Sequence, residues 1–172
     1  MKLARLSAFV SQISAFIAPR RSYSARRFPL QPQQEQAVLA ANMADNMAAH
    51  HPPDLNLLTA TASDLQRMLT AGSTTSRDLV ALYARQIAAY DGYLKAMIAV
   101  TPAGVLERTA AELDKERAAG RLRGPLHGIP IVVKDNIATV PELGLPTTCG
   151  SLALVGSKPR QNAAIIDLLI AA

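Results

Sequence analysis

Apolar residues recur at intervals of three and four along two stretches before residue 95, and this spacing predicts helices with one buried face. The first helix is short, and we expect Ser63 and Gln66 to begin it as a capping box and Gly72 to end it. The second helix is longer, with Thr75 as its N-cap and Asp91-Gly92 at its end. Both helices are expected to face one core.

A third helix is predicted from Pro102 to about Ala119, because proline suits the start of a helix and apolar residues return at helical spacing. Its charged residues between Glu107 and Arg117 are expected on a solvated face rather than in a site. A final helix is expected to start with Asn162 as its N-cap.

Two apolar segments between these helices have the composition of β-strands. The segment Ala96–Thr101 is short and apolar, and Ile129–Val133 is rich in β-branched residues, which is typical of a strand buried on both faces. Pro130 is tolerated only near the start of such a strand or on an edge. Lys134 follows directly, so a single cation is predicted at the mouth of a buried strand. Helices that alternate with strands indicate an α/β fold.

The positive charge of the chain is concentrated at its beginning. The sequence has 172 residues, of which 49% are hydrophobic and 18% charged, so most of it is expected to be globular. The net charge is +5, but six basic residues precede the first acidic one, Glu35, and the remainder holds 12 basic and 13 acidic residues. We therefore predict no direct nucleic-acid binding by this segment. The single cysteine, Cys149, excludes an intrachain disulfide, and no run of about 18 apolar residues predicts a membrane span.

The chain is predicted to have three parts. Residues 1–31 are rich in arginine and serine and contain no acid, which is typical of a mitochondrial presequence. One alternative is a secretory signal. The other is that no targeting segment exists and that the protein is cytoplasmic. Residues 32–56 are expected to be a linker or helical extension, because the sequence HHPP at 50–53 breaks regular structure. Residues 57–172 are expected to form the folded part.

Spacing alone defines no nucleophile in this sequence. It holds no G-x-S-x-G elbow, no phosphate-binding loop and no cluster of metal ligands. His127 has no acidic or cysteine partner nearby in sequence, so a structural role is favoured. A lone lysine after an apolar strand is most often a structural cation and less often catalytic. Residue chemistry therefore leaves both roles open for Lys134.

One segment changes this balance. Gly124–Ile137, GPLHGIPIVVKDNI, closely resembles the lysine-bearing segment of the amidase signature family. Thr147–Ser151, TTCGS, resembles the next block of that family, as does the helix after Asn162. The resemblance covers roughly residues 57–172. One departure is Cys149, where the family usually has a small residue such as alanine, and no catalytic role is assigned to it.

The resemblance implies an α/β fold, the N-terminal portion of an amidase-signature domain in which helices cover a mixed sheet. Amides are hydrolysed in this family by a Ser–cis-Ser–Lys unit, and Lys134 would be its base. The amine must be uncharged to act so, which requires apolar surroundings. It would deprotonate a bridging serine that activates the nucleophilic serine, while N–H groups of a Gly-rich loop bind the oxyanion.

Neither serine is expected within this chain. The family serines lie in a Gly/Ser-rich segment well downstream of the lysine, and Ser151 and Ser157 do not stand in such a motif. The chain is therefore expected to be a fragment that is inactive alone, with a small-molecule amide as substrate of the full-length form and no cofactor or metal. Two alternatives remain open: the A subunit of glutamyl-tRNA(Gln) amidotransferase, which needs partner subunits, and a non-catalytic remnant or interaction module.

Overall fold

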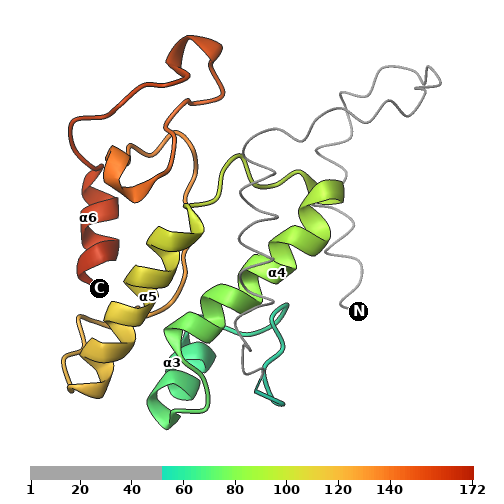
Figure 1. Cartoon of the computed structure of the whole chain (residues 1–172), viewed down its shortest axis with the longest axis vertical. Coiled ribbons are helices and arrows are strands. Elements are labelled where there is room, and N and C mark those ends of the chain that lie inside the picture. Colours follow the sequence, from blue (N-terminus) through green and yellow to red (C-terminus); the bar gives the residue numbers. More distant parts are fainter. Residues whose placement is uncertain (1–51) are drawn as a thin grey trace, which may run out of the picture.

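The structure, a computed structural model, describes residues 52–172, and all regular secondary structure in this range is helical (Figure 1). Its elements, in chain order, are α3 (Ala62–Ala71), α4 (Ser76–Leu94), α5 (Ala103–Ala118), the 3₁₀ turns η2 (Pro141–Leu143) and η3 (Leu152–Leu154), and α6 (Ala164–Ala171). No helix in the described range has the length and apolar character to cross a membrane. The predicted presequence lies outside the described residues.

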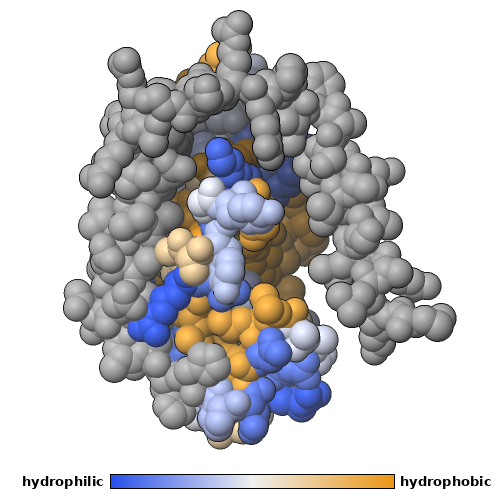
Figure 2. Space-filling view, turned by 90° about the vertical axis from the view of Figure 1, so that its right-hand side faces the viewer, coloured by the Kyte–Doolittle hydropathy of each residue, from blue (hydrophilic) through white to orange (hydrophobic). Residues whose placement is uncertain are grey.

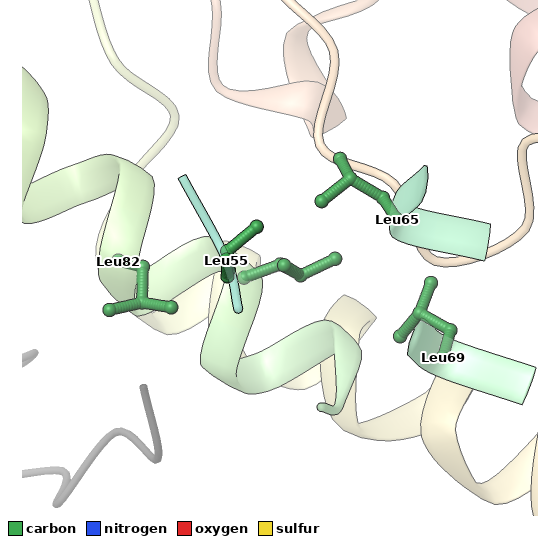
Figure 3. Close-up of a cluster of buried hydrophobic side chains, with 5 residues drawn as sticks. Leu55, Leu65, Leu69 and Leu82 are labelled. Carbon is green, nitrogen blue, oxygen red and sulfur yellow. The ribbon is translucent and has the colours of Figure 1, made fainter. Parts of the chain in front are cut away.

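Leucines of α3, α4 and the preceding chain form the core (Figure 3). Leu55, Leu65, Leu69, Leu79 and Leu82 are all at most 5% exposed, and Leu79 is completely buried. The four leucines of α3 and α4 lie on the apolar faces that the sequence predicts, whereas Leu55 precedes both helices. Full burial of a leucine stabilises the fold by about 1.5–3 kcal/mol. Helix α5 packs along α4 (Figure 1).

Helix α3 begins earlier than predicted. Thr61, not Ser63, is its N-cap: the Thr61 hydroxyl oxygen accepts the Asp64 N–H at 3.2 Å, and the Asp64 carboxylate accepts the Thr61 N–H at 2.8 Å. The capping-box pattern fits both registers, but a charged carboxylate at the third position forms the stronger bond. Gly72 ends the helix as predicted, in the left-handed conformation with φ 69°.

Helix α4 has the predicted start and a later end. Thr75 is confirmed as the N-cap and forms a capping box with Asp78. The predicted end at Asp91-Gly92 is wrong, because the helix continues to Leu94. The Asp91 carboxylate instead accepts two backbone N–H groups shortly after the helix, at 2.8 and 2.9 Å. It therefore stabilises the chain that leaves the helix rather than ending the helix.

Helix α5 follows Pro102 as predicted, but its charged face is not simply solvated. The Asp114 carboxylate accepts the N–H groups of Ser76 at 2.7 Å and Arg77 at 3.2 Å, which are the first two amides of α4. A carboxylate at a helix N-terminus satisfies unpaired donors and opposes the helix dipole. Asp114 thus fixes α5 across the start of α4, so this part of the charge run is structural.

Neither segment predicted as a strand forms one within residues 52–172. Residues 96–101 and 129–133 carry no ladder of hydrogen bonds, and Ile131 and Val132 are 44% and 71% exposed. A strand requires a neighbouring strand to satisfy its backbone groups, and these two segments instead line one hollow together. The mixed sheet of the predicted α/β fold is therefore not formed by the described residues.

Helix α6 has no side-chain N-cap, so the prediction for Asn162 is wrong. The Asn162 side chain accepts the Val140 N–H at 2.9 Å and donates to Asp167 at 2.8 Å. The Asn162 amide therefore ties a loop to the helix, and the N-cap position is occupied by Ala163. Ile166 is the buried residue of α6.

Candidate active site at the lysine segment

A buried histidine fixes the turn before the lysine. His127 is 1% exposed, its Nε2 donates to the Leu113 carbonyl at 2.9 Å, and its Nδ1 accepts the Arg123 N–H at 3.3 Å. The Nε2–H tautomer satisfies both contacts. The His127 carbonyl accepts from the side chains of Gln66 and Arg117, both at 2.9 Å. The structural role predicted for His127 is confirmed, and it holds the lysine segment against α3 and α5.

Gly128 lets this segment pass close to the start of α4. Its φ is 82°, in the left-handed region, and a Cβ there would lie 2.3 Å from the Ser76 hydroxyl oxygen and 3.7 Å from a Leu69 methyl carbon. Only glycine fits both the conformation and the space. The next residue, Ile129, packs against the leucine core. The beginning of the segment is therefore anchored in the core.

Lys134 lies on the surface and not at the mouth of a buried strand. Its side chain is exposed, as is the preceding run at Val132. The predicted apolar surroundings of the amine are therefore wrong for the described residues, because no strand covers this run. Lys134 does border a hollow of about 270 Å³, whose other lining residues include Met97, Ile98, Val133, Asp135, Thr139 and Leu145.

Asp135 joins the two sequence blocks around the lysine. Its carboxylate accepts the Thr148 hydroxyl at 2.6 Å, the Thr148 N–H at 3.1 Å and the Gly150 N–H at 3.3 Å. Partial burial raises the pKa of Asp135, but these hydrogen bonds outweigh it and hold that pKa below the usual value. Sequence reasoning missed this residue. The available signal was an acid directly after Lys134 and a Thr/Gly-rich turn 13 residues later.

The hydroxyl and thiol groups near the lysine do not form a catalytic unit. Among residues 52–172, no hydrogen bond joins Lys134 to a serine, and the Ser157 hydroxyl donates to the Thr147 carbonyl at 2.7 Å. Cys149 is exposed, with a left-handed φ of 52°. The backbone N–H groups of this turn are directed at the Asp135 carboxylate, so they do not form a vacant oxyanion site.

A second hollow offers no competing chemistry. It measures about 370 Å³, lies beside α4 and is lined mainly by apolar side chains, among them Leu58, Ile87, Tyr90, Leu94 and Met97. Figure 2 shows apolar side chains exposed on part of the face seen from the right of Figure 1. In the described part of the chain, no group of three or more His, Cys, Asp or Glu side chains could hold a metal ion. Lys134 remains the candidate for catalysis.

Comparisons with known proteins identify the family of this chain. The described fold is similar to the native peptide amidase of Stenotrophomonas maltophilia, with a TM-score of 0.59 and 43% identity over 66% of this chain and 23% of that one. A family profile described as Amidase matches residues 78–172. The chain belongs to the amidase family.

Two relatives show the range of this family. A protein of Schizosaccharomyces pombe named as an amidase is 40% identical over 116 residues, which cover 67% of this chain and 19% of the relative. The A subunit of the glutamyl-tRNA(Gln) amidotransferase of Chloroflexus aurantiacus is 40% identical over 119 residues, which cover 69% of this chain and 23% of the relative. The chain thus spans about one fifth of the length of these relatives.

Proposed function

We propose that Lys134 is the general base of an amide-hydrolysing site of the Ser–cis-Ser–Lys type. The observation that carries the proposal is the family match over residues 78–172, which include the whole lysine segment. The amine takes the proton of a bridging serine, and that serine deprotonates the nucleophilic serine. Attack on the amide carbonyl releases ammonia or an amine, and water then frees the acid.

Lys134 borders a hollow that has room for a small substrate. The hollow beside it has mostly apolar walls, which suit the apolar part of a small amide. The neighbouring carboxylate of Asp135 is occupied by Thr148 and Gly150. Because no serine of this chain stands in a Gly/Ser-rich motif, the two serines belong to a downstream segment of the family fold, and the 172-residue chain alone hydrolyses no amide.

A glutamine-dependent amidotransferase component is the second candidate. The relative from Chloroflexus aurantiacus, at 40% identity, favours it. Such a protein releases ammonia from glutamine and works with partner subunits. Ammonia release that requires glutamine, together with co-purification of partner subunits, supports this candidate over a free-standing amidase. The presequence proposed for residues 1–31 would place either protein in mitochondria.

The first proposal is tested in a chimera that supplies the serines. Residues 57–172 replace the matching part of the Stenotrophomonas maltophilia peptide amidase, and the release of ammonia from a peptide amide is measured. Lys134→Ala is expected to lower kcat by about 10²–10⁴-fold, the usual contribution of a general base. Lys158→Ala is the matched control, since this lysine is also exposed.

Two outcomes would contradict the proposed function. A folded, active chimera in which Lys134→Ala keeps the full rate contradicts the proposal. The unmodified 172-residue chain is assayed in parallel with a simple aryl amide. Turnover by that chain, abolished by Lys134→Ala, contradicts the proposed need for a downstream serine segment.

A further inference from the structure

The part of the chain that carries Lys134 has few contacts of its own. Among the described residues, no backbone N–H from Ile131 to Lys134 donates a hydrogen bond. The Lys134 carbonyl accepts the Ile137 N–H at 2.9 Å, which closes a turn with Asp135 inside it. The lysine is therefore exposed and sits on a short turn, so its position depends on what holds that turn.

Asp135 connects this turn to a second turn that is shaped to bind a carboxylate. Cys149 and Gly150 are both left-handed, with φ 52° and 70°. Consecutive N–H groups in such a turn converge on one side and form an anion-binding concavity. The Thr148 hydroxyl, at 2.6 Å, adds a short charge-assisted bond. The Asp135 carboxylate is thus held at three points by residues 148–150.

We infer that Asp135 is a positioning residue for Lys134: by binding the turn at residues 148–150, its carboxylate fixes the turn that presents the lysine amine. The inference rests on the proposed function, because only a catalytic amine needs a fixed position. Catalytic groups must be held close to their productive geometry by residues around them. Asp135, the residue directly after Lys134, supplies such support, and the leucine core does not.

The single cysteine allows a direct test in the complete 172-residue chain. Cys149 is exposed and lies inside the turn that Asp135 binds. A reagent carrying a maleimide and an N-hydroxysuccinimide ester is attached to Cys149, and the lysines that it then acylates are identified by mass spectrometry. The readout is the yield of crosslinks to Lys134 relative to those to Lys158, which is nearby in sequence.

Asp135→Asn is expected to lower this crosslink ratio by about fivefold, because the effective concentration of the Lys134 amine at the reagent falls. Thr148→Val removes only the hydroxyl donor and is expected to give a smaller fall. Asp54→Asn, which changes an exposed aspartate outside the site, is the matched control and should leave the ratio unchanged. Urea unfolding of each variant shows whether it folds.

An unchanged ratio in folded Asp135→Asn overturns the inference. So does an equal loss of both crosslinks, since it indicates a general structural role. If Asp135→Asn does not fold, Thr148→Val decides, and an unchanged ratio there overturns the inference as well. The crosslinks form without turnover, so this failure is distinct from that of the proposed function, which the Lys134→Ala chimera reports. In that chimera, Asp135→Asn is expected to lower kcat about tenfold with little change in KM.

Discussion

The two halves of the described structure are packed in different ways. Residues 52–128 contain the buried leucine core, and both Leu79 and His127 are at most 1% exposed. In residues 129–172 only Thr139 and Ile166 are buried, and much of the chain is irregular (Figure 1). The first half is thus held by apolar burial. The second half depends mainly on polar anchors such as Asp135.

The lysine lies just beyond the boundary between these halves. Ile129 packs against the leucine core, whereas Val132 is 71% exposed. The leucine core therefore fixes the start of the lysine segment, and the Lys134 amine lies on the loop that follows. Functional residues are often found on loops positioned by a rigid scaffold. The comparison teaches that mutations on the two sides of residue 128 should act differently, on stability before it and on site geometry after it.

Alanine substitutions at two glycines, one in each half, are expected to give the largest difference in the free energy of unfolding. Gly128 and Gly156 have nearly the same φ, 82° and 80°, but only Gly128 has atoms in the space that a Cβ would fill. Gly156→Ala should cost about 1 kcal/mol from the left-handed conformation alone. Gly128→Ala should cost about 3 kcal/mol, since overpacking against the buried Ser76 hydroxyl is added. Urea unfolding gives both values, and equal costs would contradict the close contact.

The buried histidine is the next test. His127→Leu fills the same space with an apolar side chain. It leaves the Leu113 carbonyl and the Arg123 N–H without their hydrogen-bond partner. We expect a loss of about 2 kcal/mol in the free energy of unfolding. Val132→Ala, in the exposed run, should change it by less than about 0.5 kcal/mol. A larger loss for Val132→Ala than for His127→Leu would show that the second half is packed like the first.

The corrected start of α3 has a smaller effect. Thr61→Ala should cost about 1 kcal/mol, the usual value for an N-cap, and Ser63→Ala should cost almost nothing. The Thr61 hydroxyl oxygen accepts the Asp64 N–H, whereas Ser63 is exposed within the helix. Thermal unfolding of the two variants measures the difference. The reverse order would restore the capping box predicted from the sequence.

Local patterns were sufficient to predict the helices but not the segments between them. The apolar stripes and Thr75 predicted helices, because helices satisfy their own hydrogen bonds within a few residues. The run at 129–133 has strand composition, but a strand depends on a partner that composition does not specify. The same limit explains the missed contacts of Asp114 and Asp135, which bridge 38 and 13 residues. Lys134 was identified by a motif, but its exposure depends on what lies over it.

The acid dependence of stability is the finest test of the polar anchor in the second half. Hydrogen bonds from Thr148 and Gly150 hold the pKa of Asp135 below its usual value of 3.8 in spite of partial burial. Its stabilisation is therefore fully present above the pKa of the unfolded chain and is lost as the pH falls towards the lower pKa of the folded chain. Because the carboxylate is partly solvated, we expect a contribution below about 1 kcal/mol.

Asp135→Asn isolates this contribution, since asparagine resembles the protonated acid. The free energy of unfolding of the unmodified chain should exceed that of Asp135→Asn near neutral pH, and the gap should close as the pH falls below about 4. The pKa values of Asp64 and Glu116 are also lowered by hydrogen bonds, but both residues are present in the two proteins and cancel in the difference. Urea unfolding between about pH 3 and about pH 6 measures the gap. A gap of constant size over this range would mean that the hydrogen bonds from residues 148–150 do not stabilise the ionised carboxylate of Asp135. The second half would then lack this polar anchor.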